Sequence, residues 1–463
     1  MLSRRHASVF LGAFTAALIS GCYMRVVPLA KDDASVSDVA SAQDAGMTPS
    51  EDAPAAPDVP LDPPRGAGSV DLLLVMDNSA SMRASQDYVN ERLSIVLGDL
   101  IERHGVRDVR VGVVTSDLGT PGANVPQCRA PDTGDDGLLN PRVRGPASAL
   151  TTLPMAPAPV FCERLPALPY IALRSSDDAM LRYWATSCHG TVGTSGCGLE
   201  QPLEAARRAL VEHGRGANAG FLRSEATLAI LVVSDEEDGS VRDCRRHDGV
   251  GPCDDATDVF QAASTRWASP DLNLRFYDYD PGSAQDPTWP IERYVDPARP
   301  TRGLLGLKPG HPERVVFGAI TGVPVALPQR ADGSTDWDAL LGPPAPGRPD
   351  DFNARIARGA VQNLSDPSGP TSMRSRDRDP ECPARMLPAC RVPGPHPTPS
   401  CTISEQRFAW RARRIAEVAR RMDESVLCAG APCRNGMVAS ICDEGDTSPF
   451  TRFAAMIARR VVR

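Results

Sequence analysis

Two short runs of nearly continuous aliphatic residues constrain the fold more than any other feature of the chain. One run is Val70–Met76, interrupted only by Asp71, and the other is Leu228–Val233. Strands that are apolar on both faces are typical of parallel sheets covered by helices on both sides. Amphipathic helical patterns follow the first run at Ser81–Leu100 and precede the second at Leu199–Glu212. We therefore predict an α/β fold with a doubly wound, mostly parallel sheet.

Weaker patterns extend this alternation to the end of the chain, so that the predicted domain covers residues 69–463. Further strands are expected at Val109–Thr115, Leu272–Tyr277, Val315–Ile320 and Met437–Ile441, and helices at Glu405–Met422 and Pro449–Val461. Three stretches rich in Pro and Gly exceed ordinary connection lengths, at about 117–170, 278–312 and 325–403. We interpret them as insertions on one core, with a separate small domain at 325–403 as the alternative.

The amino terminus has the pattern of an export signal. A basic start at Arg4 and Arg5 precedes the apolar stretch Ala7–Ser20, and Gly21-Cys22 follows. This arrangement resembles a bacterial lipoprotein signal, in which the Cys thiol is acylated after cleavage. We therefore expect a signal peptide at residues 1–21 and a lipid on Cys22, with an ordinary cleaved signal as the alternative.

The segment that follows Cys22 is dominated by Ala, Asp, Ser and Pro up to about residue 68. Such a composition buries too little apolar surface to offset the entropy of ordering the chain. Residues 22–68 are predicted to be a tether, and the lipid to be the only membrane anchor. The expected location is the cell envelope, at the outer membrane.

The cysteine count agrees with export. The chain has 13 Cys, and subtracting a lipidated Cys22 leaves 13 − 1 = 12, an even number. Exported proteins with an even count commonly form disulfides. Zinc is the alternative, although no Cys-x-x-Cys pair occurs. Short separations favour local pairing within three groups: Cys188 with Cys197; Cys244 with Cys253; and Cys428, Cys433 and Cys442 among themselves.

Overall charge excludes one broad class of partner. The formal net charge is −8 at pH 7. Nucleic-acid binders concentrate positive charge on the surface that meets the phosphates. We therefore expect no nucleic-acid partner.

The most informative polar motif follows the first apolar strand. Asp77, Ser79 and Ser81 offer one carboxylate and two hydroxyls at alternate positions, and hard divalent cations prefer such oxygen ligands. Asp235 follows the second apolar strand, Leu228–Val233. Ligands of open α/β sheets bind at the carboxyl ends of the strands. The sequence thus predicts a cation site at this edge, for Mg²⁺ or alternatively Mn²⁺ or Ca²⁺.

This Asp-x-Ser-x-Ser motif resembles the metal-ion-dependent adhesion site of von Willebrand factor type A domains. Together with Gly-Cys-Gly-x-Glu-Gln-Pro-Leu at 196–203 and Ser-Ile-Cys-Asp at 440–443, it is similar to lipoproteins of this family in myxobacteria and related Gram-negative bacteria. The resemblance implies a metal at Asp77, Ser79 and Ser81, with Asp235 acting through water. It also implies that an acidic residue of a partner protein fills an open coordination position.

One position departs from the family pattern. The Thr that supplies a further ligand in the family aligns with Cys197, and a disulfide-bonded Cys is a poor ligand for a hard cation. Thr194, Ser195 and Glu200 are the candidate substitutes. We expect a disulfide between Cys188 and Cys197 to pin this loop.

The acidic residues that follow Asp235 need a separate interpretation. Glu236, Glu237 and Asp238 are interpreted as a solvated loop, since most such charges are exposed. Asp238 is the best candidate among them for an indirect role at the metal.

Three functions are compatible with the motifs. The preferred one is a non-enzymatic binding module. A metal-dependent hydrolase would use Asp77 and Asp235 on a bound water, but His189 is the only His near the motifs in sequence. A structural lipoprotein with a vestigial metal site is the third.

Overall fold

The computed structural model of the 463-residue chain describes residues 68–120, 130–139, 169–177, 179–242, 286–341, 401–404, 407–409, 412–443 and 445–461. Several predictions lie outside these residues: the signal peptide 1–21, Cys22, the tether up to residue 67, Cys244, Cys253, the strand Leu272–Tyr277 and most of the 117–170 and 325–403 insertions.

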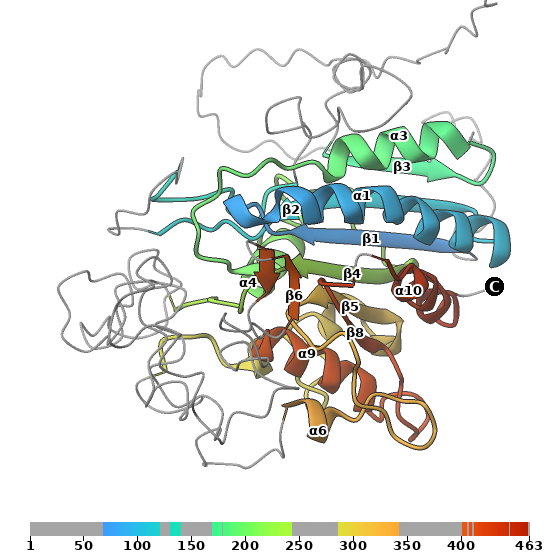
Figure 1. Cartoon of the computed structure of the whole chain (residues 1–463). Coiled ribbons are helices and arrows are strands. Elements are labelled where there is room, and N and C mark those ends of the chain that lie inside the picture. Colours follow the sequence, from blue (N-terminus) through green and yellow to red (C-terminus); the bar gives the residue numbers. More distant parts are fainter. Residues whose placement is uncertain are drawn as a thin grey trace, which may run out of the picture. The chain divides into compact units, whose positions relative to one another are not determined.

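The described residues build a six-stranded mixed sheet in the order β3-β2-β1-β4-β5-β8 (Figure 1). Only β3 runs antiparallel to its neighbour, and the other neighbouring pairs are parallel. The prediction of an α/β fold with a mostly parallel sheet is confirmed. The strands are β1 (Ser69–Met76), β2 (Asp108–Thr115), β3 (Tyr170–Arg174), β4 (Thr227–Ser234), β5 (Val315–Thr321) and β8 (Gly436–Ser440).

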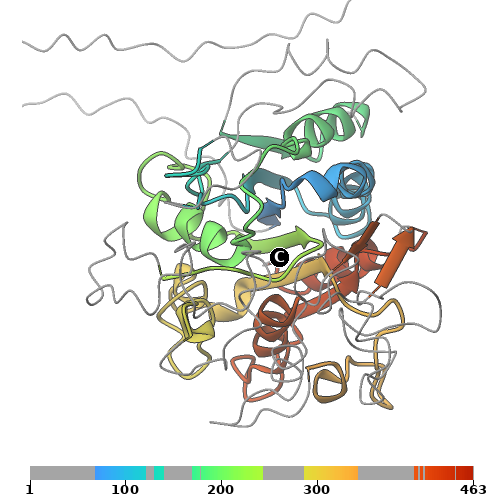
Figure 2. The same cartoon turned by 60° about the vertical axis from the view of Figure 1, so that its left-hand side comes forward.

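Helices cover both faces of the sheet, which explains why β1 and β4 are buried along their whole length. Leu72 and Leu74 of β1 pack with α1 (Arg83–Gly98) and α10 (Ser448–Ala458). Leu73, which points to the other face, packs with α4 (Pro202–Arg207) and α9 (Arg413–Glu424). The rotated view in Figure 2 shows α1 in blue and α4 in light green on opposite sides of the strands.

Shorter elements complete the fold. Two helices continue into π-helical turns, at Asp99–Arg103 after α1 and at Arg208–Glu212 after α4. The remaining elements are α3 (Ala179–Gly190), α6 (Trp337–Leu341), the hairpin of β6 (Cys401–Ser404) and β7 (Arg407–Ala409), and 3₁₀ helices at Ala80–Met82, Ile291–Arg293, Leu305–Leu307 and Pro312–Arg314.

The predicted helix Glu405–Met422 is wrong in its first part. Residues 407–409 form strand β7, and the helix begins at Arg413. The Glu237 carboxylate accepts hydrogen bonds from the backbone N–H groups of Arg413 and Arg414, at 2.9 and 3.1 Å. A carboxylate at this position caps the helix, so a distant residue helps to set where α9 starts.

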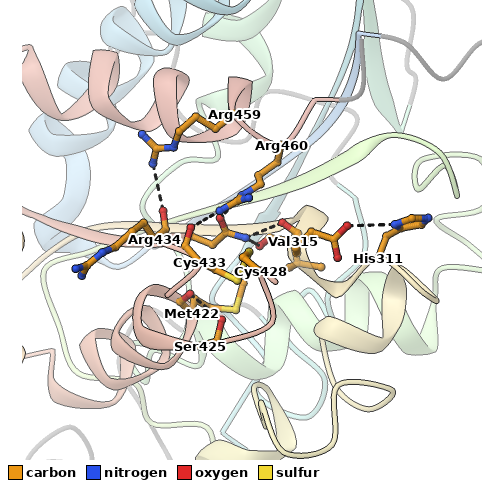
Figure 3. Close-up of a disulfide and its surroundings, with 11 residues drawn as sticks. His311, Val315, Met422, Ser425, Cys428, Cys433, Arg434, Arg459 and Arg460 are labelled. Carbon is orange, nitrogen blue, oxygen red and sulfur yellow. Dashed lines mark hydrogen bonds and ion pairs between the residues drawn. A yellow bond between two sulfur atoms is a disulfide. The ribbon is translucent and has the colours of Figure 1, made fainter. Parts of the chain in front are cut away.

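The segment between α9 and β8 contains a disulfide. Cys428 and Cys433 are bonded, with their Cα atoms 5.1 Å apart (Figure 3). Arg460, two residues after the end of α10, donates a hydrogen bond to the carbonyl of Cys433. This bond links the segment to the end of α10. Cys188, Cys197 and Cys442 are also disulfide-bonded. The pairing of Cys188 with Cys197 stays a prediction.

Candidate metal centre

The two predicted carboxylate positions lie at neighbouring strand ends. β1 and β4 are parallel neighbours, and Met76 is in register with Val233. Asp77 follows β1 and its backbone N–H donates to the carbonyl of Val233 at 2.9 Å. Asp235 comes one residue after the end of β4. The sheet therefore brings Asp77 and Asp235 to the same edge.

The Asp77 carboxylate is fully buried and held on both oxygens. Oδ1 accepts from the backbone N–H of Ser79 at 2.7 Å, and Oδ2 accepts from the hydroxyl of Ser234 at 2.7 Å. Burial raises the pKa of Asp77, and the hydrogen bonds from Ser234 and Ser79 oppose this rise. Ser234 is thus a site residue that the sequence analysis did not single out.

The two serines of the motif connect Asp77 to Asp235. The hydroxyls of Ser79 and Ser81 lie 2.9 Å apart, and Ser81 donates to Oδ1 of Asp235 at 3.2 Å. Ser79 is buried, whereas Ser81 is exposed. The predicted residues thus form one hydrogen-bonded series from Asp77 to Asp235, and Ser81 within it reaches the protein surface.

The loop 193–198 is attached directly to this motif. Gln86 of α1 donates to the carbonyls of both Asp77 and Gly193, at 2.9 and 2.8 Å. The backbone N–H of Gly196 donates to the carbonyl of Asn78 at 3.0 Å. A Cβ atom on Gly196 would lie 2.2 Å from Oδ1 of Asn78, so a larger residue would displace the Asn78 side chain.

The three candidate substitutes for the family Thr behave differently. The side chains of Thr194 and Ser195 are half-buried, and the structure shows no hydrogen bond from either to a described residue. Cys197 is disulfide-bonded, so its sulfur is not a free thiolate. Glu200 is buried and accepts a hydrogen bond from the hydroxyl of Ser116, which follows β2.

The environment of Glu200 is acidic. Burial raises the pKa of Glu200 well above its usual value, and the nearby carboxylates of Asp77 and Glu236 raise it further. Its atom Oε1 is buried and has no hydrogen-bond partner. Glu200 therefore presents one oxygen that nothing in the described protein satisfies.

The interpretation of residues 236–238 as a solvated loop is wrong for Glu237 and Asp238. Glu237 caps α9, as described above. Asp238 is fully buried, accepts from the backbone N–H of Leu203 at 3.1 Å and pairs with Arg414 at 2.9 Å. Both carboxylates hold helix starts, and these tertiary contacts are invisible in the local sequence.

The donor atoms fit a hard cation. The motif offers carboxylate and hydroxyl oxygens, which suit Mg²⁺, Mn²⁺ or Ca²⁺. No group of three or more His, Cys, Asp or Glu side chains among the described residues is arranged to hold a metal. Any cation at Asp77 therefore depends on the serine hydroxyls as well as on carboxylates.

No protein-family model matches the chain, and no curated protein gives a significant match to it.

Proposed function

We propose that this protein is a non-enzymatic binding module that engages a partner protein through a divalent cation. Asp77, Ser79 and Ser81 hold the cation, most favourably Mg²⁺, and Asp235 acts through a bridging water. An acidic side chain of the partner takes an open coordination position. The likeness of the motif to the adhesion site of von Willebrand factor type A domains supports the proposal.

One observation carries the proposal. The motif residues and Asp235 form a continuous hydrogen-bonded series at the carboxyl edge of β1 and β4. Asp77 and Asp235, at its two ends, are buried, and Ser81 between them is exposed. A cation on these oxygens would be anchored inside the protein and accessible to a partner from outside.

We also propose that the module is tethered to the cell envelope by a lipid on Cys22. Within the described part of the chain, none of the helices combines the length and apolar character of a membrane span. Replacement of the acylated thiol in Cys22→Ser should move the protein from the membrane to the aqueous fraction after detergent-phase partitioning. An equally membrane-bound variant would contradict the lipid anchor.

A capture experiment tests the partner-binding function. The lipid-free protein is immobilised and exposed to its own envelope extract in Mg²⁺ or in a chelator. We expect a partner that is retained in Mg²⁺, released by the chelator and not captured by Asp77→Ala. Asp338→Ala is the matched control, because Asp338 lies on α6 with a side chain 60% exposed. Retention by Asp77→Ala equal to that of the control would contradict the proposal.

A further inference from the structure

The backbone of Glu200 contacts the segments that lie on either side of Asp77. It forms a bridge with Asp117, which follows β2, and its carbonyl accepts from Gly239, beyond β4, at 2.6 Å. In the sheet order, β1 lies between β2 and β4. The segment that carries Glu200 therefore crosses the end of β1, where Asp77 is.

Only one of the two carboxylate oxygens of Glu200 forms a hydrogen bond. The residue is 1% exposed, and one carboxylate oxygen accepts from Ser116. The other oxygen, Oε1, is buried without a hydrogen bond. A buried carboxyl oxygen without a hydrogen bond is unfavourable, and more so when the group is ionised, so this atom needs a positively charged or hydrogen-bonding partner.

Several other buried carboxylates of the described residues are paired with an arginine. Asp71 pairs with Arg223 at 2.8 Å, and Glu204 pairs with Arg293 at 2.8 Å. Asp77 and Glu200, by contrast, interact with each other, and no basic side chain of the described residues forms an ion pair with either. Two buried acidic groups without a counter-charge are stabilised by a bound cation.

We infer that Glu200 is a direct ligand of the cation held at Asp77 and substitutes for the threonine that the von Willebrand A pattern has at the position of Cys197. Glu200 and Asp77 balance the two charges of the ion, so the site retains a divalent cation before any partner binds. This inference rests on the proposed function and deepens it. It predicts that the protein alone binds Mn²⁺ and Mg²⁺, because affinity at oxygen sites grows with the number of charged ligands.

Calorimetric titration of the purified chain with Mn²⁺ tests the inference. Glu200→Gln keeps the shape of the side chain and removes its charge, and we expect the Kd to rise by about tenfold or more. Asp77→Asn should abolish binding. The matched control is Glu102→Gln, because Glu102 lies in the turn after α1, near the opposite end of the sheet, with a side chain 62% exposed. Its Kd should equal that of the parent.

The outcomes separate the two proposals. If Mn²⁺ binds the parent and Glu200→Gln equally but not Asp77→Asn, Glu200 is not a ligand and the proposed function stands. If the parent binds no Mn²⁺, the proposed function itself fails. A second variant guards against misfolding of the first: Glu200→Asp keeps the carboxylate and should bind Mn²⁺ more tightly than Glu200→Gln. The reverse order would overturn the inference.

Discussion

At the scale of single residues, Lys308 shows how this protein handles a buried charge. It is one of two lysines in the chain, its side chain is fully buried, and its ammonium lies 3.9 Å from the carboxylate of Asp71. Burial lowers the pKa of Lys308 to about 8, and the Asp71 carboxylate opposes this shift. The charged form is therefore less favourable in the folded protein than in the unfolded chain.

This shift predicts a pH dependence of stability. Above pH 8 the folded protein has lost a proton that the unfolded chain keeps until about pH 10.5, so stability rises with pH across this window. The slope contributed by one group is at most about 1.4 kcal/mol per pH unit. Urea unfolding between pH 7.5 and 9.5 should show this rising contribution in the parent and not in Lys308→Met. Identical pH profiles for the two proteins would contradict the assignment.

Some of the site residues could be predicted from the sequence, and others could not. Asp77, Ser79, Ser81 and Asp235 could be predicted, because each follows an apolar run whose end is readable in the sequence. Glu200 was only one of three alternatives, because its proximity to Asp77 depends on how the chain after α3 crosses the sheet edge. Ser234 was not singled out, because its hydrogen bond to Asp77 depends on how β1 and β4 pair.

At the scale of elements, the strongly buried strands were predictable, and the edge strand β3 was not. β4 was predicted within one residue at each end, because the continuous apolar run that marks it in the sequence is the part of the chain that is buried on both faces of the sheet. β3 was missed, since this antiparallel edge strand has only five residues and Leu173 alone among them is buried. α9 was predicted too long because its first residue is set by the carboxylate of Glu237.

The contact between β8 and α9 provides a test at this scale. A Cβ atom on Gly436 of β8 would lie 1.8 Å from the carbonyl oxygen of Ala419 and 2.8 Å from the backbone nitrogen of Asp423. Both atoms belong to the backbone of α9, so the helix would have to move away. We expect Gly436→Ala to reduce the free energy of unfolding by about 1–3 kcal/mol.

The control for this substitution is Gly445→Ala, because Gly445 is exposed and its nearest neighbour to an added Cβ is 3.9 Å away. Urea denaturation should shift the midpoint of Gly436→Ala to lower urea and leave that of the control unchanged. Equal midpoints would mean that β8 and α9 are not packed as described.

At the scale of the whole fold, the buried carboxylates at the two ends of β1 differ in whether basic side chains balance their charge. β1 holds a fully buried aspartate near its start, and a second follows its end. Asp71, near the start, is balanced by Arg223 and Lys308. Asp77, after the end, has hydroxyl and acidic neighbours instead. We therefore interpret the balanced end of β1 as structural, and we propose the unbalanced end as the place for a cation.

The central claim is that a divalent cation binds at the carboxyl edge of β1. The most direct measurement is anomalous diffraction from crystals of the protein grown with Mn²⁺. The account predicts a manganese peak within roughly 2.0–2.4 Å of oxygen atoms of Asp77, Ser79 and Ser81. An ordered Asp77 motif without such a peak, or a peak found only elsewhere, would contradict it.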